Sequence, residues 1–254
     1  MSGRLHVTGW SEWAQGVTGT LPEGAARHVQ VWRSQPGDQV QLFDGHGECW
    51  TAEVVSMGRR EVVVRLLQPA PVQSELPIEV TLALGMPAND RMDFLVEKAS
   101  ELGVRRIQPL VCARSVLRLD GERAQKKVAH WQAVASAACE QSGRLLVPEV
   151  APVMGLKAYL AQSASFAGEG DGAVACAMLS PRASVSFGGW AQAAQAAQTR
   201  RWTFLSGPEG GLSPEEEQEA AAAGWSGVRL GPRILRADTA PLAVMAMLGM
   251  LHER

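Results

Sequence analysis

Several features that mark other classes of protein are missing from this sequence. No apolar run reaches the roughly 18–20 residues that a membrane-spanning helix needs. The first residues, MSGRLHVTGW, lack the apolar core of a secretory signal peptide. The four cysteines, at 49, 112, 139 and 176, form no CxxC pair, and the five histidines show no HExxH spacing. We therefore expect a cytoplasmic protein with no metal and no membrane association, whose cysteines are buried for packing.

The sequence also lacks a large excess of either positive or negative charge. The 254 residues include 24 Lys and Arg against 26 Asp and Glu, a net charge of −2, so no global field draws the protein onto nucleic acid. Residues 103–127 are the exception, because seven basic residues there face only Asp120 and Glu122. This run is either a solvated face or a local anion-binding patch.

The composition changes once along the chain. Residues 1–68 predict short strands at 39–44, 48–57 and 61–67, a turn at DGHG and one helix over 23–32. QPAPVQSELP, residues 68–77, holds three prolines and predicts an extended connection. We therefore expect a small domain over 1–70, a linker over 71–77 and a larger domain over 78–254.

The larger domain alternates apolar strands with helices. Strands are predicted at 78–84, 105–112, 174–179, 201–206 and 227–230, and the last helix over 238–252. Residues 155–172 have a loop-like composition. Strand, helix, strand, helix predicts an α/β fold with a parallel sheet covered on both faces.

Two glycine loops follow strands of that sheet. GPEGGLSPEE, 207–216, comes after RWTFLS, and Ser213, Pro214 and Glu216 predict a capping box at a helix start. LGPRILRADTAP, 230–241, follows the next strand, so we expect the two loops side by side at the carboxyl edge, where α/β sheets bind ligands. Neither loop contains a lysine or a GxGxxG pattern, and Glu209 suits a neutral or cationic ligand better than phosphate.

These two loops, with DRMDFLVEKASELGV (90–104) and CEQSGR (139–144), resemble the small-subunit ribosomal RNA uridine N3-methyltransferases of the SPOUT class. HVQVWRSQPGDQVQLFDGHG, 28–47, resembles the same family's PUA-like domain. The resemblance implies an N-terminal PUA-like β-barrel and a C-terminal trefoil-knotted parallel-sheet methyltransferase domain. It also implies S-adenosyl-L-methionine as cofactor, 16S ribosomal RNA in the small ribosomal subunit as substrate, and a homodimer.

The same resemblance implies roles for individual residues. Arg236 is expected to stabilise negative charge developing on the base, and Asp238 is either a general base or only a helix cap. Contacts with RNA are expected from Arg4, Arg27, Arg33, Arg114 and Arg144. Arg144 is also expected to form a wall with Glu140 and Gln141 on the side of the RNA or of the partner subunit. Contacts with the cofactor are expected from Leu179, Leu205, Gly207, Pro208, Glu209, Gly210, Gly211, Leu230, Gly231, Ile234, Leu235, Arg236 and Thr239.

Three departures from the family pattern leave two alternatives open. Ala88-Asn89 stands where the family has a lysine-glycine pair, Glu97 where it has glutamine, and Ala237-Asp238-Thr239 where it has Thr-Glu-Thr. A missing lysine weakens the expected contact with RNA. The first alternative is therefore the same chemistry on transfer RNA or large-subunit RNA, and the second is a non-catalytic ribosome assembly factor.

Overall fold

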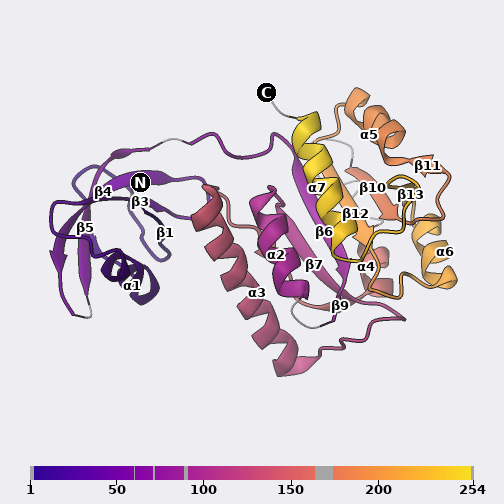
Figure 1. Cartoon of the computed structure of the whole chain (residues 1–254), viewed down its shortest axis with the longest axis horizontal. Coiled ribbons are helices and arrows are strands. Elements are labelled where there is room, and N and C mark those ends of the chain that lie inside the picture. Colours follow the sequence, from indigo (N-terminus) through magenta and orange to yellow (C-terminus); the bar gives the residue numbers. More distant parts are fainter. Residues whose placement is uncertain (1–2, 60, 71, 89–90, 164–173, 253–254) are drawn as a thin grey trace. The chain divides into compact units, whose positions relative to one another are not determined.

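The computed structural model describes residues 3–59, 61–70, 72–88, 91–163 and 174–252. The chain divides into two compact units, which are described separately (Figure 1). The first unit contains Met1–Glu75 and Ser136–Val147, and the second contains Leu76–Ala135 and Pro148–Arg254. No helix in the described ranges has the length and apolar character of a membrane span.

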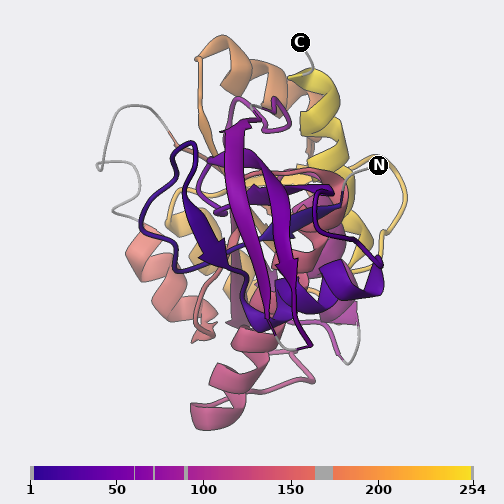
Figure 2. The same ribbon diagram turned by 90° about the vertical axis from the view of Figure 1, so that its left-hand side faces the viewer.

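The first unit is built on a five-stranded mixed sheet, whose indigo-to-purple strands face the viewer in Figure 2. The strand order is β1-β3-β4-β5-β2, with β1 and β3 parallel and the other pairs antiparallel. The predicted DGHG turn is confirmed, because the carboxylate of Asp44 accepts the N–H of His46 and of Glu48. The strands are β1 Arg4–His6, β2 Thr18–Thr20, β3 Gln39–Phe43, β4 Cys49–Met57 and β5 Val62–Pro69.

The predicted helix of this unit is α1, Glu23–Val31, which packs three apolar side chains into the core of the sheet. Its end carries the two backbone bonds of a Schellman motif, from Arg33 N–H to Gln30 O and from Ser34 N–H to Val29 O. The residue that follows the helix C-cap in this motif is normally glycine. Here it is Arg33, with φ of 58°, a left-handed conformation that costs an L-residue about 1–2 kcal/mol.

The predicted boundary at 71–77 leaves out one segment of the first unit. Ser136–Val147, the end of α3 (Gly121–Ser142) and the chain after it, groups with the N-terminal residues. The reason is a shared apolar cluster of Phe43, Cys49, Cys139 and Leu145. Composition along the chain does not reveal such a return, and residue 71 of the predicted linker lies outside the described residues.

A buried ion pair fixes this segment. Arg144 is 3% exposed, and its Nη2 and Nε donate to Oε2 of Glu75 at 2.7 and 3.1 Å. The other oxygen of Glu75 accepts the N–H of Leu145 and of Leu146. The Glu75 carboxylate therefore neutralises a buried cation and satisfies two backbone donors at once.

The second unit contains an eight-stranded parallel sheet. The order is β11-β13-β10-β12-β6-β7-β8, and β9 also pairs with β7. Its strands are β6 Glu79–Gly85, β7 Arg106–Val111, β8 Glu149–Val150, β9 Met154–Gly155, β10 Val174–Leu179, β11 Val185–Ser186, β12 Arg201–Ser206 and β13 Ser226–Arg229. The predicted parallel sheet is confirmed.

Helices cover both faces of this sheet, as predicted. One face packs against α2 (Arg91–Glu101), the first part of α3, α5 (Phe187–Ala196) and α7 (Thr239–Leu251). The other face packs against α4 (Leu156–Ser163) and α6 (Pro214–Ala222). Alternate residues of β6 serve the two faces, since Leu82 and Leu84 join the first core and Ala83 joins the second. The trefoil knot stays a prediction.

The loop predicted over 155–172 is wrong in its first half, because Leu156–Ser163 forms α4. This helix buries Leu156, Tyr159 and Leu160 against the sheet, and its hydroxyl-bearing Ser163 accepts a hydrogen bond from the indole of Trp225. Burial of these side chains against the sheet therefore stabilises a helix that the local sequence pattern does not predict. Residues 164–172 of that prediction lie outside the described residues.

The cysteines are packing residues, as predicted. Cys49, Cys112 and Cys139 are buried, and Cys176 is partly buried. Burial raises the pKa of the Cys112 thiol to about 12 and the pKa of the Cys139 and Cys176 thiols to about 11. Thiols with such values stay protonated near neutral pH and are poor nucleophiles.

Replacing Glu75 by glutamine removes the charge that neutralises Arg144. We expect Glu75→Gln to lower the free energy of unfolding of the first unit by about 2–3 kcal/mol, because a buried guanidinium loses its counter-ion. The measurement is urea denaturation followed by circular dichroism.

Glu53→Gln is the matched control, since it breaks an exposed pair with Arg65 in the same unit. This control should cost less than about 1 kcal/mol. Equal effects of the two variants would contradict the structural weight given to Glu75.

Candidate functional site

Three strands, not two, end at the candidate site. The two glycine loops follow β12 and β13, which were expected to be neighbours. In the structure β10 lies between them and pairs with both. The expectation of adjacent strands is therefore wrong, because chain order does not fix strand order in a parallel sheet. All three strands run in the same direction, so their carboxyl ends still meet at one edge.

The first loop, 207–213, is held by tight backbone packing. A Cβ atom on Gly207 would lie 2.7 Å from the N of Leu212, and one on Gly85 would lie 2.6 Å from the N of Pro208. Neither position has room for a side chain. The predicted capping box is confirmed, since Ser213 and Glu216 bond each other's backbone N–H at the start of α6. The other carboxylate oxygen of Glu216, Oε1, accepts the N–H of Ala113 and so ties the loop to the chain after β7.

The second loop, 230–238, is open to solvent. Gly231 takes a positive φ of 86°, and Ile234 is 85% exposed. Arg236 accepts the N–H of Thr239 through its carbonyl, so its backbone is fixed while its side chain is exposed. Asp238 stands at the N-cap position of α7, as predicted, but its side chain makes no cap hydrogen bond and accepts the hydroxyl of Thr239 at 3.2 Å.

The third segment, Ser180–Arg182 after β10, was not predicted as part of the site. Ser180 donates to Oε1 of Glu217, and Nη2 of Arg182 lies 2.8 Å from the same oxygen. Only Leu179 had been named in this region. Segment 180–182 contains no glycine and carries no motif, so its one detectable signal was its position after an apolar strand.

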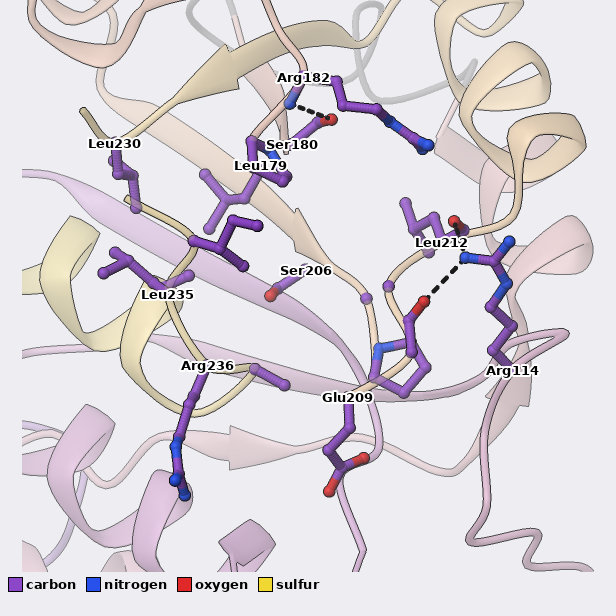
Figure 3. A pocket seen from close by; sticks show the side chains of 18 of the residues that line it. Arg114, Leu179, Ser180, Arg182, Ser206, Glu209, Leu212, Leu230, Leu235 and Arg236 are labelled. Atoms are coloured by element: carbon purple, nitrogen blue, oxygen red, sulfur yellow. Dashed lines mark hydrogen bonds between the residues drawn. The ribbon is translucent and has the colours of Figure 1, made fainter. Parts of the chain in front are cut away.

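These segments enclose a cavity of about 560 Å³, within the usual range for small-ligand sites (Figure 3). Most of the predicted cofactor contacts line it. Three predicted cofactor contacts do not line it: Leu205, which is buried in the core, Gly231 and Thr239. Asp238, the predicted catalytic candidate, is also absent from the wall. The predicted residues that line the cavity are Leu179, Gly207, Pro208, Glu209, Gly210, Gly211, Leu230, Ile234, Leu235 and Arg236.

The wall of the cavity is apolar in part and rich in arginine. Leucine side chains of both loops and of β10 form the apolar part. Glu209 is already engaged, since its Oε1 accepts the N–H of Ala88 at 2.9 Å and lies 3.8 Å from Nη1 of Arg91. Glu217, in the first turn of α6, supplies a second carboxylate that was not predicted for the site. The arginines that line the cavity are Arg91, Arg114, Arg182, Arg233 and Arg236.

Arg114 belongs to this cavity. It was predicted to contact RNA, yet its Nη1 donates to the carbonyls of Gly210 and Leu212 at 2.8 and 3.2 Å. The guanidinium therefore braces the glycine loop through its carbonyls, as Figure 3 shows for one of these bonds. Arg236 and Glu209 extend in the same direction from loops on opposite sides of the cavity (Figure 3). A group presented there would meet one cation and one carboxylate.

The other predicted RNA contacts lie in the first unit. Arg27 and Arg33 are exposed at α1. Arg4 donates twice to Oε1 of Gln41, and its Nη1 is buried with no hydrogen-bond partner among the described residues. The predicted RNA contact of Arg144 is corrected, because its buried pairing with Glu75 gives this residue a structural role.

The basic run 103–127 does not act as one patch. Arg106 pairs with Glu149 and Lys126 with Glu122, and Arg114 is taken up by the glycine loop. The solvated-face reading therefore fits most of it. Within the described ranges, no three His, Cys, Asp or Glu side chains gather as a metal would require.

Two family models match the chain. An RNA methyltransferase domain matches residues 74–249, and an RNA methyltransferase PUA domain matches residues 21–67. Their limits leave 68–73 between them, close to the predicted linker. The predicted domain limits themselves stay a prediction.

Two similar curated relatives carry the same name, "Ribosomal RNA small subunit methyltransferase E". The protein from Synechocystis sp. is 31% identical over 238 residues, covering 93% of this chain and 74% of the relative. The protein from Bacillus subtilis is 31% identical over 225 residues, covering 89% of this chain and 86% of the relative.

Solved structures agree with the relatives. A ribosomal RNA small subunit methyltransferase E from Neisseria gonorrhoeae, bound to S-adenosyl methionine, superposes with a TM-score of 0.86 at 33% identity, covering 99% and 98% of the two chains. A putative methyltransferase from Legionella pneumophila, in complex with the same cofactor, gives a TM-score of 0.87 at 29% identity over the same shares.

A methyl group on Gly207 tests the loop geometry directly. Gly207→Ala places a carbon 2.7 Å from backbone, so the loop must move. We expect its affinity for S-adenosylmethionine, the cofactor that the sequence predicts, to fall about tenfold or more, measured by isothermal titration calorimetry.

Gly210→Ala is the matched control in the same loop, because the three atoms nearest its new carbon are side-chain carbons of Arg114, at 3.1 Å or more, and not backbone atoms. Its affinity should stay within about threefold of wild type, a difference below about 0.7 kcal/mol. Equal losses in the two variants would show that backbone packing at Gly207 does not shape the site.

Proposed function

The chain belongs to the ribosomal RNA small subunit methyltransferase E family, and on that premise we propose that it methylates N3 of a uridine in 16S ribosomal RNA. The methyl donor is S-adenosylmethionine. The observation that carries the proposal is the cavity at the ends of β12, β10 and β13, lined by both loops that carry the family resemblance.

The residues of the cavity fit this cofactor. When bound, S-adenosylmethionine supplies an electrophilic methyl group on a sulfonium cation, together with an adenine ring and an amino-acid tail. The backbone N–H and C=O groups of a side-chain-free loop suit the polar edge of adenine, and leucines of the wall suit its faces. Glu217 and Arg182 offer a carboxylate and a guanidinium for a tail of both charges. No phosphate is present in the cofactor, which agrees with a loop that lacks lysine.

Arg236 carries the proposed catalytic role. N3–H of uridine is a weak acid, so attack by N3 requires loss of its proton and leaves negative charge on the base. The exposed guanidinium of Arg236 lines the cavity on a backbone held by the Thr239 N–H, and it stabilises that charge as it develops. Asp238 is the weaker candidate for a base, because its carboxylate lies off the cavity wall and accepts the Thr239 hydroxyl.

The substrate is proposed from the relatives' shared name and from the first unit. Exposed Arg27 and Arg33 offer phosphate contacts, and a rigid ribosomal surface adds recognition by shape to a chain of low net charge. The target base must be unstacked to reach the cavity. Because the proposed substrate is ribosomal RNA, a cytoplasmic location is part of the proposal.

One departure favours a second substrate class. Where the family has a lysine before DRMD, the chain has Ala88, whose N–H donates to Glu209. A lost phosphate contact at the cavity rim fits an RNA other than 16S, such as transfer RNA or large-subunit RNA. Parallel assays on the three RNAs decide between the classes.

The assay uses purified protein, labelled S-adenosylmethionine and small subunits from cells that lack this enzyme. We expect one methyl group per subunit, located on N3 of a uridine by mass spectrometry. Arg236→Ala should lower kcat about 100-fold, because a donor to a developing anion is lost, while cofactor affinity stays within a few-fold.

Arg236→Lys, which keeps the charge, should recover part of that rate. Methylation of transfer RNA in place of the small subunit would overturn the substrate. No methylation of any RNA would leave only the non-catalytic assembly factor. Unchanged kcat in Arg236→Ala would remove that residue from the mechanism.

We further propose that two copies of the chain pair through α7 and α2. Met247, Met250 and Leu251 are 43%, 78% and 38% exposed and lie on one face of α7 by their spacing. Phe94 on the neighbouring helix α2 is 48% exposed. Apolar side chains gathered in this way are typical of a surface that a protein partner covers.

Met250→Asp tests the pairing. A buried, unpaired carboxylate disfavours the dimer, so light scattering after size exclusion should give about half the mass of wild type. Val116→Asp is the control, since Val116 is also 78% exposed and lies outside both helices. A wild-type monomer, or a dimer unaffected by Met250→Asp, would refute the interface.

A further inference from the structure

One tryptophan of the chain differs from the other seven. Trp32, at the end of α1, is 43% exposed, whereas the rest are buried or partly buried. Its neighbour Val31 is 71% exposed. A large aromatic side chain left in solvent loses the free energy that burial would supply. Its position therefore calls for an explanation outside the fold of the unit.

The indole of Trp32 is held against backbone on one side. A Cβ atom on Gly3 would lie 2.1 Å from two of its ring carbons, so the ring packs directly over a residue without a side chain. The ring of His28, one helical turn earlier, lies 6.1 Å away at a tilt of 39°. These contacts fix the orientation of the indole and leave much of it accessible.

The next residue, Arg33, has a strained left-handed backbone conformation. It occupies the left-handed position of the Schellman motif, where glycine removes the strain. Strained non-glycine residues cluster at functional sites, where the side chain is needed. A cation also favours the negative end of α1, which is a purely structural reason for a basic residue here. The two reasons predict different results for a glycine variant.

Exposed arginines occur near Trp32 in the sequence and on the turn that contacts α1. Arg27 precedes Val31 by one turn and is exposed, and the turn that carries exposed Arg59 is hydrogen-bonded to Gln30 through its backbone. Two carboxylates near this surface accept hydrogen bonds from the protein. Glu140 accepts the N–H of His6 and lies 3.6 Å from Nδ1 of His28, and Asp38 accepts the N–H of Gln35. A rigid, exposed aromatic ring followed directly by an exposed arginine suits nucleic acid better than an apolar protein surface.

We propose that Trp32 is a stacking platform for one unpaired base of the RNA substrate, with Arg33 bound to the phosphate beside that base. Stacking on an aromatic ring and neutralisation of the backbone are the two contacts by which proteins hold single-stranded RNA. The proposal rests on the proposed function, because it assigns part of the substrate's binding energy to the first unit.

The experiment measures binding of a fluorescein-labelled, 12-nucleotide single-stranded RNA of mixed sequence to the full chain, by fluorescence anisotropy. Trp32→Ala should weaken binding on the order of tenfold, the usual scale for one lost stacking contact. Trp32→Phe keeps a ring and should stay within about threefold. Val31→Ala removes an exposed apolar group without a ring and should bind as wild type does.

Arg33→Gly separates the functional reason from the structural one. If the side chain serves RNA, this variant should bind the probe several-fold more weakly, with a salt dependence reduced by about one phosphate contact. Its unfolding temperature should equal or exceed that of wild type, because glycine relieves the left-handed strain. Arg33→Lys keeps the charge and the strain and should retain most of the affinity. A lower unfolding temperature with unchanged RNA affinity would overturn the proposal for Arg33.

Methylation of small subunits is measured on the same variants. Trp32→Ala should raise KM for subunits with kcat within about twofold, and its affinity for S-adenosylmethionine should be unchanged. If wild type does not methylate any RNA, the proposed function fails by itself. If wild type is active and Trp32→Ala matches it in KM and in probe affinity, the platform is refuted. A change in oligomeric state alone would assign Trp32 to a protein contact and also refute it.

Discussion

The spacing of three parallel strands is the constraint on which the site depends. Neighbouring strands lie about 4.8 Å apart, so β10 between β12 and β13 sets the starts of the two glycine loops about 10 Å apart. Adjacent strands would have left room for little more than one chain of atoms. The inserted strand widens the edge to the breadth of a small ligand and brings Ser180–Arg182 into the wall.

Steric packing then fixes the first loop within that space. Gly85 at the end of β6 and Gly207 after β12 both lack room for a side chain, and Arg114 and Glu216 hold the loop from outside. The glycines thus serve backbone packing as much as ligand approach. Carboxylates and guanidinium groups occur together in the wall, which suits a zwitterionic cofactor and disfavours a phosphate ligand.

Much of the architecture could be predicted because local sequence patterns indicate the individual strands and helices. Apolar runs such as RWTFLS and the Ser213–Glu216 capping box matched β12 and the start of α6. Strand order could not be predicted in this way, since it depends on contacts distant in sequence. The same limit hid the return of Ser136–Val147 to the first unit, the burial of Arg144 against Glu75, and the entry of Arg182 and Glu217 into the cavity. Motif-bearing residues were found, and residues placed only by topology were missed.

The central claim is that the cavity at the ends of β12, β10 and β13 holds S-adenosylmethionine through protein groups alone. Isothermal titration calorimetry of the wild-type chain, with and without a metal chelator, tests it most directly. We expect one S-adenosylmethionine per chain in both conditions, displaced by its demethylated product. Absence of binding, or binding that the chelator abolishes, would contradict this account of the site.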